Sequence, residues 1–136
     1  MVDQVTFTLP SFKRGIHLIT SLIEVQLPVL PGSGLINIFL HHTSASLALN
    51  ENADPTVRAD FESFLDSLAP ENDHSYSHIL EGSDDMPAHL KSSVMGQSLN
   101  IPVISGKMGL GTWQGVYLCE FRNRGGARRI TITVVS

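Results

Sequence analysis

The chain has 136 residues, of which 42% are hydrophobic and 16% are charged, and its formal net charge is −4. This length fits one domain over residues 1–136, and the charge balance gives no basic footprint for nucleic acid. No apolar run is long enough to cross a membrane as a helix, and the scarcity of charged residues predicts an apolar face that another copy of the chain covers.

The first part of the chain has strand-like patterns. The alternation of polar and apolar residues from Gln4 to Leu9 predicts a half-buried strand that Pro10 ends. The mostly apolar segment from Gly15 to Leu30 predicts a strand that continues as a short helix. The apolar run from Leu35 to Leu40 has the length of a strand and predicts a central strand buried on both faces.

A short strand from Leu47 is followed by a predicted helix from Pro55 to Leu68. Asp54 is a natural N-cap, and Pro55 suits the first helical position because the N–H that it lacks would have no partner there. The apolar residues are expected on one face, packed on a sheet; they are Val57, Phe61, Phe64, Leu65 and Leu68.

The segment from Tyr76 to Lys91 contains two histidines, three carboxylates and a lysine. Its glycine and proline exclude a central strand, so we expect a loop that enters a helix. Asp84 or Asp85 would cap this helix, and Gly96 would end it. The start of a helix carries partial positive charge, so it is a place where an anion or a metal-bridged phosphate can bind.

The last third is rich in strand-forming residues. Ser98–Ile104 predicts a strand that Pro102 places at an edge or a bulge. The glycine-rich segment 106–115 matches neither of the common phosphate-binding loops. Trp113 within it is a stacking surface or a core filler, and we expect it to fill the core. The segments 116–121 and 129–134 predict a hairpin joined by an arginine-rich turn. That turn is more simply explained as solvated than as a phosphate site.

About seven strands and two helices, without regular alternation, predict an α+β domain with a mostly antiparallel sheet. The single cysteine, Cys119, excludes an internal disulfide and fits a reducing compartment. Because it falls in an apolar strand, we expect a small buried side chain rather than a catalytic thiol.

Two adjacent histidines, His41 and His42, follow the predicted central strand directly. In an extended chain their side chains point to opposite faces, so at most one of them would face a given pocket. Taken alone, this pair is weak support for a functional site.

Four motifs occur together in the order of the chain. They are His42-Thr-Ser-Ala-Ser-Leu47, Asn50-Glu-Asn-Ala-Asp-Pro55, His78 to His89 and Leu110-Gly-Thr-Trp-Gln-Gly115. They resemble those of the YjbQ-like family, also called the secondary thiamine-phosphate synthase family. The resemblance implies a compact α+β fold and a cytoplasmic homotrimer. It also implies an activity that joins a pyrimidine pyrophosphate to a thiazole phosphate, forming thiamine phosphate.

The resemblance also suggests roles for residues of these motifs. His42, His78 and His89 would hold a divalent metal. Histidine ligands favour zinc, whereas carboxylate ligands favour magnesium. His78, Glu51 and Glu81 would act in catalysis, as bases or by orienting the histidines. The phosphorylated substrate would contact Asn52, Lys91, Trp113 and Gln114. Two other functions use the same pocket: a metal- or ligand-binding module without catalysis, and a metal-assisted hydrolase.

Overall fold

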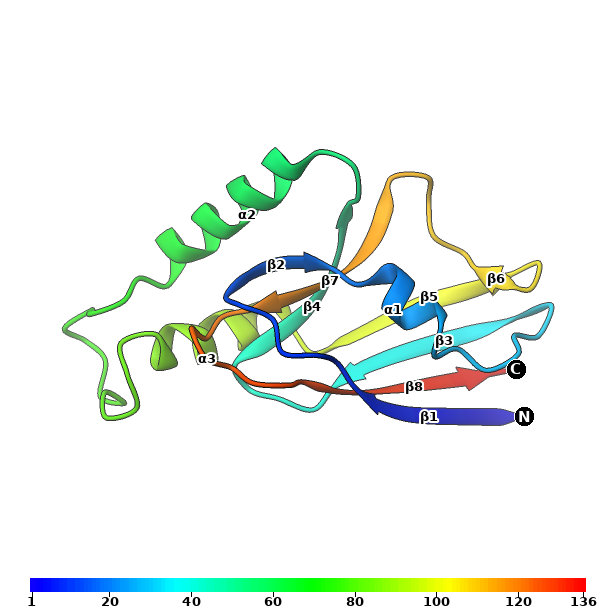
Figure 1. Ribbon diagram of the computed structural model, residues 1–136, viewed down its shortest axis with the longest axis horizontal. Helices are drawn as coiled ribbons and strands as arrows, with labels where there is room; N and C mark the ends of the chain where they lie inside the picture. Colours follow the sequence, from blue (N-terminus) through cyan, green and yellow to red (C-terminus); the bar gives the residue numbers. More distant parts are fainter.

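The computed structural model describes residues 1–136 and contains two antiparallel β-sheets and three helices (Figure 1). The strands are β1 (Val2–Thr8), β2 (Gly15–Leu18), β3 (Ser33–Leu40), β4 (Ala45–Glu51), β5 (Ser98–Ile104), β6 (Lys107–Met108), β7 (Gln114–Glu120) and β8 (Arg129–Val135). The helices are α1 (Thr20–Glu24), α2 (Pro55–Leu68) and α3 (Asp85–Met95). These elements confirm the predicted α+β class.

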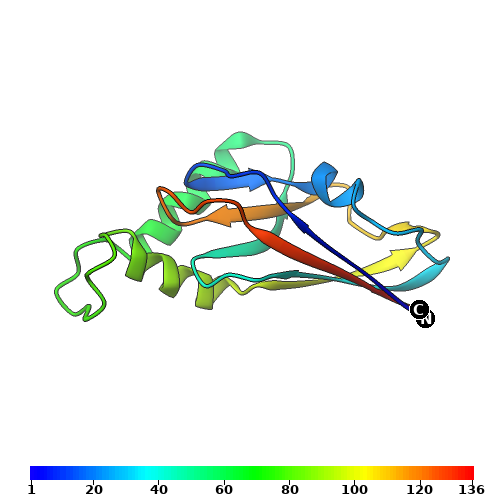
Figure 2. The ribbon, with the colours of Figure 1, turned by 60° about the horizontal axis from the view of Figure 1, so that its bottom comes forward.

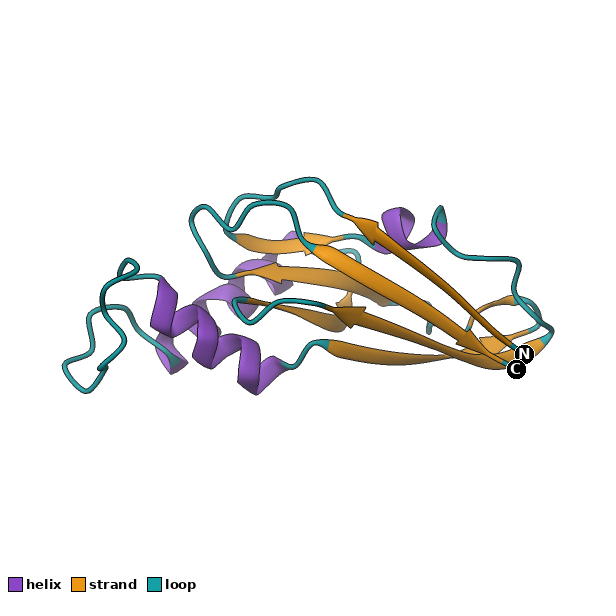
Figure 3. Cartoon of the chain, turned by 90° about the horizontal axis from the view of Figure 1, so that it is seen from below, coloured by secondary structure: helices purple, strands orange, loops and turns teal.

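The sheets form two layers, with α2 on the side of the smaller sheet and α3 at one end of the molecule beside β4 (Figure 2). The larger sheet has the strand order β1-β8-β3-β5-β6, and the smaller has the order β2-β7-β4. The main core lies between the sheets, where alternate residues of β3, β5 and β8 meet β4 and β7. A second apolar cluster lies beneath the two long helices and contains Ala48, Leu65, Ala88, Tyr117, Cys119 and Phe121. The helices therefore cover only the smaller sheet (Figure 3).

Helix α2 has the predicted bounds because its local signals agree. The Asp54 side chain accepts a hydrogen bond from the Thr56 N–H at 2.9 Å, and Pro55 occupies the first turn. The predicted apolar face is only partly buried. Leu65 is 2% exposed, whereas Phe64 is 65% exposed, because the helix contacts the smaller sheet along a narrow strip.

Strand β3 is central, between β8 and β5, but it is not buried on both faces as predicted. Ile36 and Ile38 are fully buried, whereas Leu35 and Phe39 are 43% and 42% exposed. The reason is that no helix covers the outer face of the larger sheet. On that face Val2, Val135, Leu35 and Pro102 are neighbours in register across four strands, and we call them the apolar row.

The predicted hairpin of β7 and β8 is wrong. Strand β7 pairs with β2 and β4 in the smaller sheet, whereas β8 pairs with β1 and β3 in the larger one. The connection between them crosses from one sheet to the other. The arginine-rich sequence forms this crossing, and its turn signals alone cannot distinguish a crossing from a hairpin.

Two predictions about single side chains have different outcomes. Cys119 is fully buried, as predicted, and burial raises its pKa to about 11, which leaves the thiol protonated and unreactive. The expectation that Trp113 fills the core is wrong, since its side chain is 65% exposed. None of the three helices has both the length and the hydropathy of a membrane span.

A buried ion pair joins the two sheets where the chain crosses between them. Arg128 contacts Glu120 through Nε at 2.7 Å and through Nη2 at 2.6 Å, and the two residues are 4% and 1% exposed. The same guanidinium donates to the Ser44 carbonyl at 3.3 Å. Gly125 lies against this carboxylate, since a Cβ there would be 2.3 Å from a Glu120 oxygen.

We expect Arg128→Met to lower the free energy of unfolding by about 3–5 kcal/mol, because it leaves the Glu120 carboxylate buried without a partner. Urea denaturation followed by circular dichroism measures the loss. The exposed Arg124 supplies the matched control, Arg124→Met, which should change little. Equal stabilities for the two variants would contradict the structural role of the pair.

Candidate functional site

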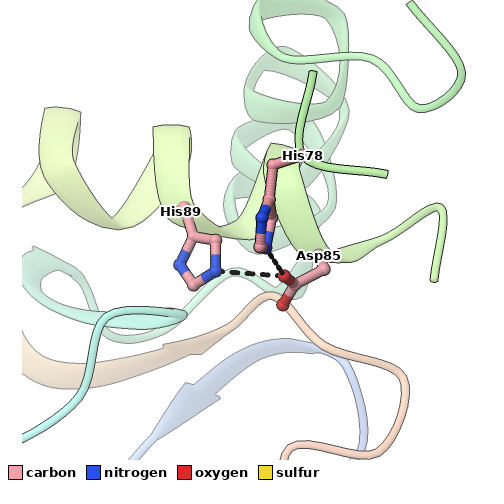
Figure 4. A group of neighbouring side chains, drawn as sticks. All are labelled: His78, Asp85 and His89. Atoms are coloured by element: carbon pink, nitrogen blue, oxygen red, sulfur yellow. Dashed lines mark hydrogen bonds and ion pairs between the residues drawn. The ribbon is translucent and has the colours of Figure 1, made fainter. Parts of the chain in front are cut away.

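Helix α3 and the connection before it bring two of the predicted histidines together. His78 lies in the α2–α3 connection, which extends beyond the sheets at one end of the molecule (Figure 1). Asp85 is the first residue of α3, and His89 follows one turn later on the same face. The three side chains converge on one point, where both imidazole rings meet the same oxygen of the Asp85 carboxylate (Figure 4).

One oxygen of Asp85 lies between the two imidazole rings. Its Oδ2 atom is 2.6 Å from Nε2 of His78 and 3.1 Å from Nε2 of His89. One ligand atom from each residue lies within 4.8 Å of the others. Asp85 is 1% exposed, whereas the side chains of His78 and His89 are 45% and 31% exposed. The cluster therefore has a buried carboxylate on one side and is open to solvent on the other.

A backbone carbonyl fixes the protonation of His89. Nδ1 of this ring is 2.8 Å from the Thr43 carbonyl, which can only accept, so Nδ1 carries a proton. In the neutral ring, Nε2 then presents a lone pair to the Asp85 carboxylate. Such a contact is unfavourable unless a proton or a metal ion lies between the two atoms. Two imidazoles and one carboxylate around an open side are a zinc-type ligand set, so these residues fit a metal.

Arg122, from the β7–β8 connection, supports the carboxylates from behind. Its Nε donates to Asp84 at 2.9 Å, and its Nη1 donates to the second oxygen of Asp85. Burial raises the pKa of Asp85, but the hydrogen bond from His78 and the charges of His89 and Arg122 outweigh it and hold the pKa below its usual value. Asp85 is therefore ionised near neutral pH and available to a cation.

Of the two ligands expected at the start of α3, an anion by itself does not suit the site, whereas a metal-bridged phosphate stays a prediction. Asp84 and Asp85 place two carboxylates there, Pro87 has no N–H, and the N–H of Ala88 bonds to the Asp84 carbonyl at 3.1 Å. The charge of Arg122 is already paired with both aspartates. A phosphate would be repelled unless a cation were bound first.

Glu81 lies at the open side of the cluster. Its Oε2 is 3.7 Å from Nε2 of His78, and its side chain is 63% exposed. Beside it a hollow of about 130 Å³ runs along the loop, with His78, Gly82 and Met86 among its lining residues. Glu81 is thus close enough to receive a proton from a water or substrate held in front of the histidines.

His42, the third histidine of the predicted metal site, is not part of this cluster. Its Nε2 accepts the Arg129 N–H at 2.8 Å, which fixes the end of β3 to the start of β8. Burial, and then the charge of Arg128, lower the pKa of His42. The third group of the cluster is instead the carboxylate of Asp85.

Four other predicted residues lie at the far end of the β4–β7 pair. Glu51 of β4 pairs with Gln114 of β7 at this end. At the other end Ala45 pairs with Glu120, which lies two residues before Arg122. Six residues of extended strand separate the two ends by about 20 Å. At the far end Glu51 accepts the Asp54 N–H at 2.8 Å, Asn52 donates to the Gln114 carbonyl at 3.2 Å, and Trp113 is exposed. Within one chain these side chains do not reach the histidines.

Lys91 is also turned away from the cluster. It is 2% exposed, and its Nζ is 2.5 Å from Asp66 and 5.5 Å from the centre of the Phe121 ring. Asp66 also accepts from Arg14 at 3.1 Å. Lys91 therefore holds α3 against α2, and a direct contact with a phosphate would require this ion pair to break.

Sequence reasoning found the histidines but did not identify the groups that organise them. Asp85 was not distinguished from Asp84, although only Asp85 lies four residues before His89 and so shares its helical face. That spacing was the available signal. Nothing local indicates Arg122 or the Thr43 carbonyl, because both reach the cluster through the packing of distant segments.

Comparison with known proteins gives matches over almost the whole chain. The family model described as "UPF0047 protein YjbQ-like" matches residues 5–136. The UPF0047 protein YjbQ of Salmonella typhimurium is 53% identical over 133 residues, covering 96% of each chain, and that of Escherichia coli is 51% identical over the same length and share.

Two solved structures have the same fold. A conserved hypothetical protein of Thermus thermophilus is 34% identical with a TM-score of 0.83, and the match covers 96% of this chain and 99% of that one. A YjbQ-like protein of Sulfolobus solfataricus, described as of unknown function, also has a TM-score of 0.83 and covers 98% and 96% of the two chains. At 23% identity it supports the fold alone.

Proposed function

We propose that this chain, which belongs to the UPF0047 YjbQ-like family, joins a hydroxymethylpyrimidine pyrophosphate to a thiazole phosphate at the His78–Asp85–His89 cluster with a divalent metal. Thiamine phosphate forms and pyrophosphate leaves. The observation that carries the proposal is the Asp85 oxygen between two imidazole nitrogens, one of which has its lone pair fixed toward that oxygen.

The charges around the cluster make the metal necessary for this reaction. Glu81, Asp84 and Asp85 lie there with one guanidinium, that of Arg122. A pyrophosphate would approach three carboxylates and be repelled. A divalent ion held by His78, Asp85 and His89 would reverse this and neutralise the charge that develops on the leaving group. Zinc fits the two imidazoles better than magnesium does.

The residues of the chain have separate tasks in this proposal. Arg122 keeps Asp85 ionised and fixes its orientation, and the Thr43 carbonyl holds His89 with Nε2 toward the cluster. Glu81, whose Oε2 is 3.7 Å from Nε2 of His78, orients that ring. The attacking thiazole nitrogen is a neutral nucleophile, so the site needs no residue that activates it.

Metal-assisted hydrolysis of a phosphate ester is the second candidate function, and the exposure of the site favours it. His78 is 45% exposed and Glu81 is 63% exposed, so water reaches the position in front of the metal ligands. A carboxylate near a metal is a suitable base for such a water. A module that binds metal without catalysis would use the same three ligands.

The purified protein should bind one zinc ion per chain, and Asp85→Asn should abolish this binding. Thermal stability measured with and without added zinc reports it, since a ligand that binds only the folded state stabilises it. Binding should weaken at about pH 5, because protonated imidazole cannot ligate. The control is His74→Ala, an exposed histidine outside the cluster. Unchanged stability of the wild-type chain with zinc would contradict the metal site.

Thiamine phosphate should form when the zinc-loaded protein is given both phosphorylated precursors. His78→Ala should lower the rate by at least about 10- to 100-fold, since replacing even an outer-shell partner of a metal ligand costs that much. His74→Ala should retain the full rate. Release of inorganic phosphate from either precursor alone would support hydrolysis instead. If wild type and His78→Ala give the same trace rate, neither reaction occurs at this site.

We also propose that the chain assembles as a homotrimer through the apolar row on the outer face of the larger sheet, which lies at the end of the β3–β8 pair away from Phe39 and Arg129. The apolar row gives this face Leu35 and Val135, which are 43% and 44% exposed, and no helix covers it. Sedimentation at micromolar concentration should therefore show trimers, and Leu35→Lys should dissociate them. Val29→Lys, at a 95% exposed position outside the sheets, is the control. A wild-type monomer would overturn the proposal.

A further inference from the structure

A second hollow lies beside Thr43, the residue whose carbonyl contacts His89 of the histidine cluster. Its volume is about 520 Å³, and it is bounded by the end of β3, the C-terminal half of α3 and the start of β8. The Thr43 carbonyl contacts His89 of the cluster, and Thr43 also lines the hollow. The two places are therefore neighbours, but they share no metal ligand.

The hollow is electropositive in a chain of net negative charge. Arg129 lines it, is exposed and forms no ion pair, in contrast to Arg14, Arg122 and Arg128. None of the lining residues is acidic. The positive charge of Arg129 is therefore available to a ligand.

His42 supplies a directed donor beside this charge. Because its Nε2 accepts the Arg129 N–H, the neutral ring carries its proton on Nδ1. The burial of His42 and the charge of Arg128 lower its pKa, so the neutral form prevails near neutral pH. The hydroxyl groups of Thr43 and Ser93, both exposed, complete the polar lining.

We propose that this hollow binds the phosphate group of a phosphorylated small molecule. The guanidinium of Arg129 suits two phosphate oxygens, and the imidazole N–H of His42 and the hydroxyls of Thr43 and Ser93 suit the remaining lone pairs. The site requires no metal and no catalysis, so it is independent of the proposed reaction. Because the hollow lies beside the cluster, a molecule with two anionic groups can bind with one group in the hollow and the other at the cluster.

The test is a titration of the metal-free protein, kept in chelator at constant ionic strength, with inorganic phosphate and then with glycerol phosphate. Backbone amide resonances of Thr43, Ser93 and Arg129 should shift and saturate with both ligands. Tighter binding of the ester identifies a phosphorylated metabolite as the ligand, and equal binding identifies the phosphate group alone. Arg129→Gln should weaken binding about tenfold, the effect of losing one charge-assisted contact.

Two variants make the test specific. Ser93→Glu, at an exposed position of α3, places a carboxylate in the hollow and should abolish binding. Arg124→Gln removes the same charge as Arg129→Gln, at an exposed position that does not line the hollow, and should leave the affinity unchanged. Shifts that do not saturate, or equal losses in Arg124→Gln and Arg129→Gln, would overturn the proposal. Since zinc and turnover play no part, either result leaves the reaction at the cluster separately testable.

Discussion

The buried pair of Glu120 and Arg128 is the constraint on which the arrangement of sheets and site depends. It fixes the end of β7 to the start of β8, although these strands belong to different sheets. Arg128 also bonds to the Ser44 carbonyl, next to Thr43, and the Glu120 carboxylate accepts the Arg122 N–H at 3.2 Å. The segments that carry Thr43 and Arg122 to the histidines are thus positioned by one ion pair.

The same pair explains which parts of the fold could be predicted from the sequence. Helix α2 has its predicted bounds because Asp54 and Pro55 act within one turn. The separation of β7 from β8 could not be predicted, because both segments favour strands and the choice of sheet depends on a buried contact. Trp113 was misplaced for a related reason: its exposure depends on how distant strands end, which no local pattern records.

The candidate site could likewise be predicted only in part from the sequence. The segment from Tyr76 to Lys91 is a loop that enters a helix, as expected, and the rings of His78 and His89 lie there with their centroids 5.5 Å apart. The position of His42 depends on the backbone of Arg129, and the burial of Lys91 depends on Asp66 in another helix. Such long-range contacts decide whether a polar side chain serves the fold or a ligand. The roles that the resemblance suggests for His42 and Lys91 therefore depend on where the fold places these side chains.

Pro102 gives the larger sheet one protected edge. Strand β5 is covered on its outer side by only two residues of β6. At Pro102 the chain has no N–H to offer, and the carbonyl already accepts the Gly109 N–H at 2.7 Å. An extended segment from another protein therefore finds an interrupted ladder here, whereas the seven residues of β1 at the opposite edge form a continuous one. The two edges of the sheet therefore differ in their ability to pair with a further strand. Aggregation by edge pairing would begin at β1.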